Sequence, residues 1–430
     1  MPDTFMAVFK VDVTCPLEHP LCGGWIKPAS KIGTPLYCIG CVLQGPEAPV
    51  VLACLDWTGV LNQAHVDFTK VIAKAAHTTP ERVALHCVHQ HNAPFVDTVA
   101  QQWVAEQKNL PASVDVKWFE QIQQKVAKTI EESLTRLQKV THIQHGSAKV
   151  TKVASNRRLI GPDGKISGWR ASSCKDEKLR DAPEGEIDPW LRTVSFWNED
   201  SKLISIHYYA VHPMSYYGDG VVNADFVGLA REKCAEDEGV PHLYFTGCSG
   251  NIAAGKYNDG QPERRAELAE RIHKTMVESD HELNREVLTH WEWRSKPVHL
   301  PPRADLNEAD IRKVIENAKE SNANRIRAAM QLSYLKQHQA RVPIFLNGML
   351  INRHIRLIHL PGECFIEYQI YARYQLAEAI ICCAAYGDGG PWYIPTAAAY
   401  PQGGYEVTAS WVSPESEVIL QEGIKHFLRR

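Results

Sequence analysis

Apolar runs typical of buried strands alternate along the chain with segments whose apolar residues recur at helical spacing. The run at 50–56 is continuous and apolar, 61–76 has the period of an amphipathic helix, and 83–89 is again strand-like. Together they predict a β-α-β unit. A broad apolar stripe over 116–138 predicts a long amphipathic helix.

The alternation continues to the end of the chain. Residues 141–200 have the pattern of a β-rich, looped region. Three further strands, each running into a polar or small-residue loop, are predicted at 203–213, 241–251 and 355–365. Three helical segments are predicted at 262–279, at 304–340, and from the Pro361-Gly362 turn to about 382. We expect the polar 304–340 segment to lie on the surface.

No internal repeat or linker interrupts this pattern, and residues 387–412 are rich in Gly, Pro and aromatic residues. That composition favours a fixed loop over a site. We therefore expect a single large α/β domain over 1–430, with mixed β-sheets flanked by helices.

Composition limits the classes of function. The chain has 430 residues, 44% of them hydrophobic and 23% charged, and a net charge of −3. It has no basic face that would predict a nucleic-acid partner. The chain has no run of eighteen apolar residues, so we expect no membrane anchor. The sequence does not define an oligomeric state.

The N-terminal residues and the cysteines predict a cytoplasmic location. MPDTFMAVFKVDVTC has neither a cationic start nor an apolar core of the secretory kind. The twelve cysteines are therefore expected to be reduced, and many of them buried. Cys38 and Cys41 have CxxC spacing, but they lie in a strand-like stretch where alternation explains them better than redox chemistry.

Several predicted strands end in residues that can bind a metal. His89 and His91 follow one strand, and His212 follows a second. A third runs into the small-residue loop 247–250, and Glu363 follows a fourth. Because ligands gather at the carboxyl ends of strands in open α/β sheets, these loops are expected to meet. Two imidazoles and a carboxylate form a common catalytic zinc set.

Each residue also has a purely structural interpretation. His212 is compatible with a simple strand-end residue, and Glu363 with a cap of the following helix. Tyr393 is compatible with a packed aromatic side chain beside Trp392. Asp225 could orient a ligating histidine or could cap the helix that follows it. It is the ordered set of motifs that favours a site.

The chain resembles the neutral ceramidases, a family of zinc-dependent amidases. VHQHNAP (88–94) is similar to the family's THTHSGP motif, and LPGE (360–363) to its LPGE motif. Four looser similarities occur in the family's order: Asn156-Arg157, AVHPMS (210–215), GCSGN (247–251) and WYIPT (392–396). The resemblance spans nearly the whole chain and implies the fold of the family's catalytic domain.

The resemblance also implies roles for individual residues. The zinc ligands would be His89, His212, Glu363 and Tyr393. His91, with Arg157 beside it, would stabilise the oxyanion or support the ligands. Ser249 falls near the family's active-site serine, and a further tyrosine, Tyr400 or Tyr405, would complete the site.

The resemblance implies a zinc-dependent hydrolase that cleaves a non-peptide amide bond by attack of zinc-bound hydroxide. Zinc lowers the pKa of bound water from ~15.7 to ~7. Two alternatives stay open: a zinc hydrolase of an ester, lactone or sugar derivative, and a non-catalytic zinc- or ligand-binding protein on the same scaffold.

Three departures from the family's pattern argue against ceramide as the substrate of this protein. Asn92 and Ala93 replace the family's Ser-Gly pair. No secretory signal is predicted, and the sequence stops soon after the tyrosine loop, so no C-terminal immunoglobulin-like domain is expected. We therefore expect a small-molecule substrate that is smaller and more polar than ceramide.

Overall fold

The structure is a computed structural model that describes residues 3–280 and 285–429. Three α/β units with the same strand order make up most of it. In each unit three neighbouring strands are antiparallel. A fourth strand, reached through a helix, lies parallel to the third. This parallel crossover is the β-α-β unit that the alternating pattern predicts.

The first unit is the one that opens the chain. Its strands are β1 (Thr4–Asp12), β3 (Tyr37–Gln44), β4 (Val50–Leu55) and β6 (Val83–Cys87), and β8 (Gln138–Val140) extends the edge beside β1. Helix α1 (Asn62–Ala75) joins β4 to β6, and α3 (Val116–Leu134) packs beside α1. The side chain of Asp115 accepts a hydrogen bond from Trp118 N and begins α3.

The second unit repeats this arrangement. Its strands are β9 (His142–Lys149), β13 (Trp190–Asn198), β14 (Ser201–Tyr209) and β16 (His242–Thr246), and β18 (Arg285–Val287) extends the edge beside β9. Helix α5 (Asp225–Glu238) joins β14 to β16, and α6 (Glu263–Asp280) follows. Between β9 and β13 lie β10 (Ser155–Asn156), β11 (Arg158–Ile160), β12 (Ile166–Trp169) and α4 (Glu177–Asp181).

The third unit closes the chain. Its strands are β19 (Trp291–Val298), β20 (Ile344–Ile351), β21 (Ile355–His359) and β23 (Ile380–Ala384). Helix α9 (Ile366–Gln375) joins β21 to β23, and α12 (Ser416–Leu428) packs against α9 and the sheet. Helices α7 (Glu308–Glu316) and α8 (Asn322–Gln339) lie between β19 and β20, and the short helices α10 (Ala399–Gln402) and α11 (Tyr405–Thr408) precede α12.

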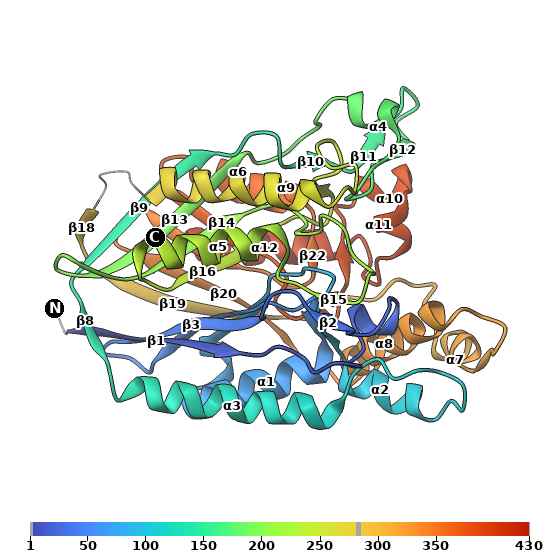
Figure 1. The fold of residues 1–430 in the computed structure, drawn as a ribbon, viewed down its shortest axis with the longest axis horizontal. Helices are drawn as coiled ribbons and strands as arrows, with labels where there is room; N and C mark the ends of the chain where they lie inside the picture. The colour runs from blue at the N-terminus through green and yellow to red at the C-terminus, as the bar shows by residue number, and fades with distance from the viewer. Residues whose placement is uncertain (1–2, 281–284, 430) are drawn as a thin grey trace.

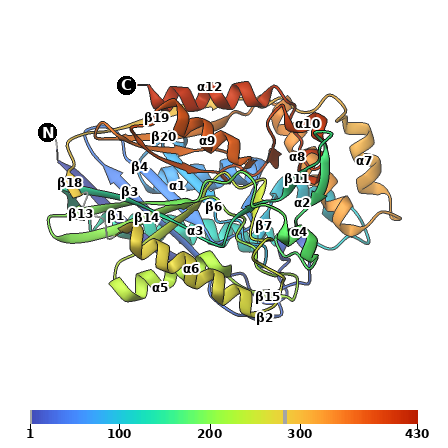
Figure 2. The ribbon, with the colours of Figure 1, turned by 90° about the horizontal axis from the view of Figure 1, so that it is seen from above.

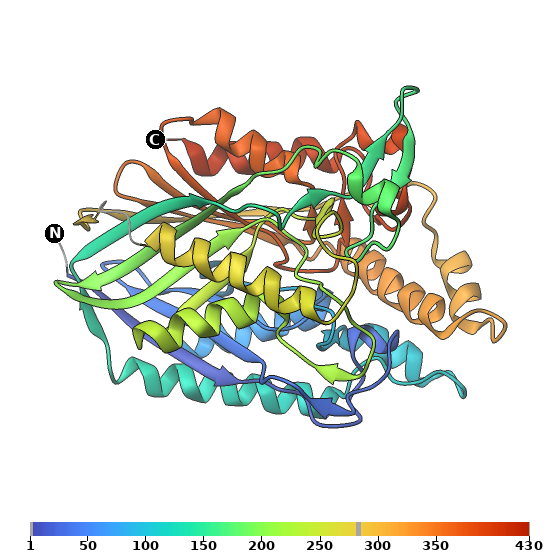
Figure 3. The same ribbon diagram turned by 45° about the horizontal axis from the view of Figure 1, so that its top comes forward.

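Each sheet therefore has its own pair of covering helices. Helices α1 and α3 lie along the lower side of Figure 1, and α5 and α6 lie in front of the strands of the second unit. The view from above places α12 and α9 on the opposite side from α5 and α6 (Figure 2), and the tilted view shows the sheets between the three pairs (Figure 3). Apolar residues of the sheets and the helices fill the space between them.

The three parallel edge strands, β6, β16 and β23, meet at their carboxyl ends. Cys87 N donates to Tyr386 O at 2.9 Å, and Ala385 N donates to Thr246 O at 2.9 Å. The Thr246 hydroxyl then donates to Val88 O at 2.6 Å. Because each unit sends its crossover strand to this point, the loops that leave the three sheets share one region.

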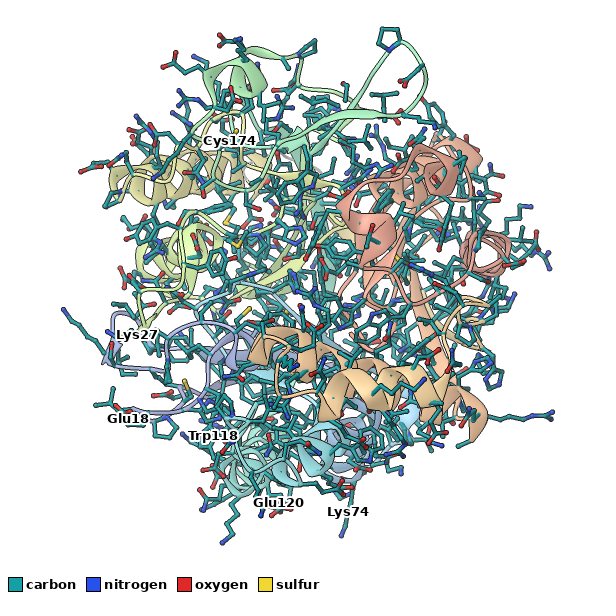
Figure 4. The ribbon with its side chains drawn as sticks, turned by 90° about the vertical axis from the view of Figure 1, so that its right-hand side faces the viewer. Glu18, Lys27, Lys74, Trp118, Glu120 and Cys174 are labelled. Atoms are coloured by element: carbon teal, nitrogen blue, oxygen red, sulfur yellow. The ribbon has the colours of Figure 1, made fainter. Side chains whose placement is uncertain are left out.

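Short paired strands fix those loops. They are β5 (Gly59–Val60) with β7 (Phe95–Val96), β10 with β17 (Ile252–Ala253), β2 (Lys31–Ile32) with β15 (Val221–Val222), and β22 (Glu363–Cys364) with β24 (Tyr393–Ile394). Helix α2 (Thr98–Ala105) and the 3₁₀ turns η1 (Cys22–Gly24) and η2 (Pro80–Arg82) complete the structure. Figure 4 shows the side of the molecule that lies to the right in Figure 1. In that view Trp118 and Glu120 of α3 lie at the lower edge, and Cys174 lies near the upper edge.

The predicted α/β class and flanking helices are confirmed, but two segments were predicted wrongly. Residues 304–340 form two helices, α7 and α8, and α8 buries ten side chains instead of lying on the surface. The helix after Gly362 ends at Gln375, and Cys382 and Cys383 lie in strand β23. The sequence did not predict the burial of α8, because its apolar residues are spread around the whole helix and form no single stripe.

The cysteines agree with the sequence prediction. All twelve are free and buried, and Cys38 and Cys41 lie within β3. No helix in the described part of the chain is long and apolar enough to cross a membrane.

A buried ion pair joins the second unit to the first. Arg231 of α5 donates from Nη1 and Nη2 to the two carboxylate oxygens of Asp56, at 2.6 and 2.9 Å. Asp56 follows β4 and also accepts from Tyr37 N at 2.8 Å. Its carbonyl accepts a hydrogen bond from the Gln90 side chain, which lies between His89 and His91.

Replacing Asp56 with Ala is expected to lower the free energy of unfolding by ~3–5 kcal/mol, because the buried Arg231 guanidinium loses both oxygens of Asp56 and keeps only its contact with the half-buried Glu232. Urea denaturation followed by circular dichroism measures this loss. Lys10→Met is the control, because the exposed Lys10–Glu232 pair contributes at most ~1 kcal/mol. A loss below ~1 kcal/mol in Asp56→Ala would contradict the buried pair.

Candidate metal centre

His89 enters the site from the loop after β6. Its backbone has φ +76°, in the left-handed region, and its N–H donates to Trp57 O at 2.9 Å. The ring nitrogen Nδ1 lies 2.6 Å from Thr58 O. We assign the proton to Nδ1, because a carbonyl oxygen can only accept. The lone pair of Nε2 then faces the site.

His212 is oriented in the same way by a different unit. It follows β14, and its Nδ1 donates to Ser249 O at 2.8 Å. Burial lowers the pKa of His212, which keeps the ring neutral at neutral pH. A neutral ring with its proton on Nδ1 leaves the lone pair of Nε2 available to a metal.

Glu363 brings the carboxylate from the third unit. Gly362 before it has φ +54°, and a Cβ there would lie 2.6 Å from Trp392 O, so the turn requires glycine. The Oε2 atom of Glu363 lies 3.4 Å from His89 Nε2 and 3.1 Å from His212 Nε2.

Tyr393 lies opposite Glu363 across the parallel pair β22–β24. Its ring is nearly parallel to that of His212, with 6.4 Å between centroids and 11° between planes. Its hydroxyl accepts a hydrogen bond from Arg157 Nη1 at 3.2 Å. Arg157 follows β10 and is held by Glu406, whose Oε1 lies 3.5 Å from Arg157 Nε.

His91 lies beside the two histidines. Ring nitrogens of His89, His91 and His212 all lie within 4.8 Å of one another. The Nδ1 atom of His91 is 3.7 Å from Cys22 Sγ, and its Nε2 has no hydrogen-bond partner among residues 3–280 and 285–429. Burial holds the pKa of His91 well below its usual range, so this ring is also neutral.

The donor atoms fit a bound cation. Four buried polar atoms point into one space without a hydrogen-bond partner in the described structure: His89 Nε2, His91 Nε2, His212 Nε2 and Glu363 Oε2. Such atoms are costly unless something binds them. In a tetrahedral zinc site with bonds of ~2.0–2.1 Å, neighbouring donors lie ~3.3 Å apart. The observed separations of 3.1 and 3.4 Å match that spacing.

The hydroxyls of Ser249 and Tyr400 do not lie where their predicted catalytic roles would place them. The Ser249 hydroxyl is buried and lies 2.7 Å from the Tyr386 hydroxyl, while its carbonyl orients His212. Tyr400 donates to Val412 O at 2.6 Å, and none of its contacts reaches the donor atoms. Tyr405 is the tyrosine near the site, with its ring 5.7 Å from that of Tyr393.

Asp225 does not orient a ligating histidine. Its carboxylate accepts from Ser215 N and Phe226 N and lies 3.5 Å from Arg265 Nε, so it holds the 213–215 loop and the start of α5. Backbone carbonyls take the orienting role instead.

Tyr386 is a site residue that the sequence analysis missed. Its ring stacks on His89 with centroids 4.3 Å apart, and its hydroxyl lies 3.3 Å from His212 Nδ1. It follows β23 as His89 follows β6, so the strand-end rule would have found it had that strand been predicted. Tyr386, His89 and Trp392 all have positive φ values, at 62°, 76° and 57°. Such strained residues cluster at functional sites.

Among residues 3–280 and 285–429, two other groups have metal-like spacing. The first is Glu238, His242 and Asp280, where the ammonium of Lys202 lies 2.6 and 2.7 Å from the two carboxylates and already supplies the positive charge. The second is His145 of β9, Glu286 of β18 and His354 just before β21, and the side chains of Glu286 and His354 are half-exposed. Only the His89 group lies where the three units meet.

Comparison with solved structures defines the class of fold. The chain has the α/β fold of the neutral ceramidase catalytic domain, as the sequence resemblance predicts. It superposes on the neutral ceramidase from Pseudomonas aeruginosa with a TM-score of 0.70 and 17% identity, covering 99% of this chain and 74% of that one. A ceramidase complexed with C2 gives a TM-score of 0.71 and 16% identity, covering 99% and 75%.

Sequence comparison finds nothing comparable. No protein-family model matches the chain, and no curated protein matches it. The likeness is therefore one of fold.

Tyr386→Phe is expected to weaken metal affinity about 10- to 100-fold, because the hydroxyl that supports Ser249 and His212 is lost. Competition with a chromophoric zinc chelator measures the affinity. Tyr334→Phe is the matched control, because that buried hydroxyl donates to Leu300 O away from the site. Equal affinities in the two variants would contradict the supporting role of Tyr386.

Proposed function

We propose that the protein is a zinc-dependent hydrolase that cleaves a non-peptide amide bond in a small-molecule substrate. The observation that carries the proposal is the convergence of unpartnered Nε2 and Oε2 atoms from three separate sheets. The ceramidase fold of the chain supports the choice of an amide bond. The proposed ligands are His89, His212, Glu363 and Tyr393.

Zinc bound by these residues would lower the pKa of a coordinated water and polarise the substrate carbonyl. In the hydrolysis, the water oxygen bonds to the carbonyl carbon, the C–N bond breaks, and the amine leaves with a proton. His91 Nε2 lies beside the ligands without a partner, so it can accept the proton from the water and return it to the amine nitrogen.

Arg157 provides a fixed guanidinium for the developing oxyanion. Its Nη1 donates to the Tyr393 oxygen at 3.2 Å and so holds that proposed ligand in place. Glu406, fully buried, holds both Arg157 and Arg158 in place. Donors that are already oriented stabilise a transition state without reorganisation.

The surroundings of the site support a substrate smaller and more polar than ceramide. An apolar cavity of about 330 Å³ lies between α1, β6 and β20, and none of the four proposed ligands lines it. Around the proposed ligands lie instead the imidazole of His91, the guanidinium of Arg157 and the ring of Tyr405. These groups favour a polar substrate.

Metal analysis tests the zinc site. Purified wild-type protein is expected to hold one zinc ion that is lost in Glu363→Ala and in His212→Ala and retained in His354→Ala. The last variant alters the half-exposed histidine group and is the matched control. Zinc content that is unchanged in Glu363→Ala would contradict the ligand set.

Activity tests the bond. Hydrolysis of short N-acyl amines is expected to stop when a chelator removes zinc and to return when zinc is added. The same assay with esters and lactones distinguishes the alternatives. Activity on those substrates alone would overturn the amidase proposal, and no activity on any of them would favour a binding protein.

A further inference from the structure

A rim of partly exposed aromatic residues borders the proposed zinc site. Tyr217 is 46% exposed, and its ring lies 5.1 Å from that of His91. Tyr405 is 38% exposed, and its ring contacts that of Tyr393. Partly exposed rings therefore contact buried site residues at two places, Tyr217 beside His91 and Tyr405 beside Tyr393.

Arg327 of α8 lies at the same rim. Its guanidinium carbon is 5.4 Å from the ring centroid of Trp25 and 5.4 Å from that of Trp392. The two indole rings themselves are 5.3 Å apart. Stacking on two tryptophans fixes the plane of the guanidinium and limits its motion.

No carboxylate within residues 3–280 and 285–429 pairs with Arg327. Its Nε atom is buried without a hydrogen-bond partner, although the residue as a whole is half-buried. Other arginines near the site are paired, since Arg157 and Arg158 share Glu406. An unpaired guanidinium kept in a partly desolvated place is costly, so its position indicates a partner from outside the chain.

Contacts connect Arg327 to the proposed ligands. Trp392 precedes Tyr393, and its carbonyl accepts the N–H of Glu363 at 2.8 Å. Helix α8 also packs against η1, where Cys22 lies 3.7 Å from His91.

We infer that Arg327, held beside the contacting rings of Trp25 and Trp392, binds a carboxylate of the substrate and selects N-acylated amino acids or related anionic amides. This inference rests on the proposed amidase function. A guanidinium presents two parallel N–H donors, which match the two oxygens of a carboxylate. One guanidinium neutralises one negative charge, whereas a phosphate monoester carries nearly two.

Binding of two isosteric probes tests the subsite directly. N-acetylglycine carries a carboxylate where N-acetylglycinamide carries a neutral amide. Calorimetric titration of zinc-loaded wild-type protein is expected to show about 10- to 100-fold tighter binding of N-acetylglycine. Equal affinity for the two probes would overturn the inference.

The metal can also bind a carboxylate, so variants are needed to distinguish its contribution from that of Arg327. Arg327→Met is expected to abolish the preference, and Arg327→Lys to retain part of it, with zinc content and circular dichroism unchanged. Arg312→Met is the matched control, because Arg312 also stacks on a tryptophan, Trp103, but pairs with Glu308. A preference that survives in Arg327→Met would overturn the inference.

Kinetics distinguish failure of the subsite from failure of the proposed function. If N-acylglycines are hydrolysed, Arg327→Met is expected to raise KM for them about 10- to 100-fold and to leave the neutral glycinamides unchanged. If neither is hydrolysed but N-acetylglycine still binds selectively through Arg327, the amidase proposal fails and the subsite stands. Hydrolysis with equal KM values in wild type and variant overturns the subsite alone.

Discussion

Two hydrogen bonds from imidazole Nδ1 atoms to backbone carbonyls determine the chemistry of this site. Thr58 O and Ser249 O fix the tautomers of His89 and His212 and direct both Nε2 lone pairs at Glu363. A carbonyl, unlike a carboxylate, adds no net negative charge to the site. The charge of the donor set therefore comes from Glu363.

The repeated architecture explains how such distant residues meet. Each unit sends one crossover strand to a shared centre, where β6, β16 and β23 are joined by hydrogen bonds near Thr246. Side chains that follow these strands or their neighbours then point into one space, as in open α/β sheets. Deep burial strengthens electrostatic interactions there, and the partly exposed rings of Tyr217 and Tyr405 border it.

Much of this arrangement could be predicted from the sequence, because the strand-end rule needs only local patterns. It located His89, His212 and Glu363 correctly at strand exits. It missed Tyr386, because Ile380–Ala384 was predicted as the end of a helix. It could not choose between Tyr400 and Tyr405, because tertiary packing decides which tyrosine faces Tyr393. The threefold repetition of strand order is also invisible in the sequence, since topology is retained without repeated residues.

X-ray absorption at the zinc edge tests the central claim most directly, because it identifies the atoms bound to the metal. Protein loaded with one equivalent of zinc is expected to show only nitrogen and oxygen ligands at ~2.0–2.2 Å, with imidazole scattering that is lost when His89 and His212 are replaced. Sulfur at ~2.3 Å, from Cys22 or another thiol, would contradict this account, as would a zinc spectrum unchanged by those replacements.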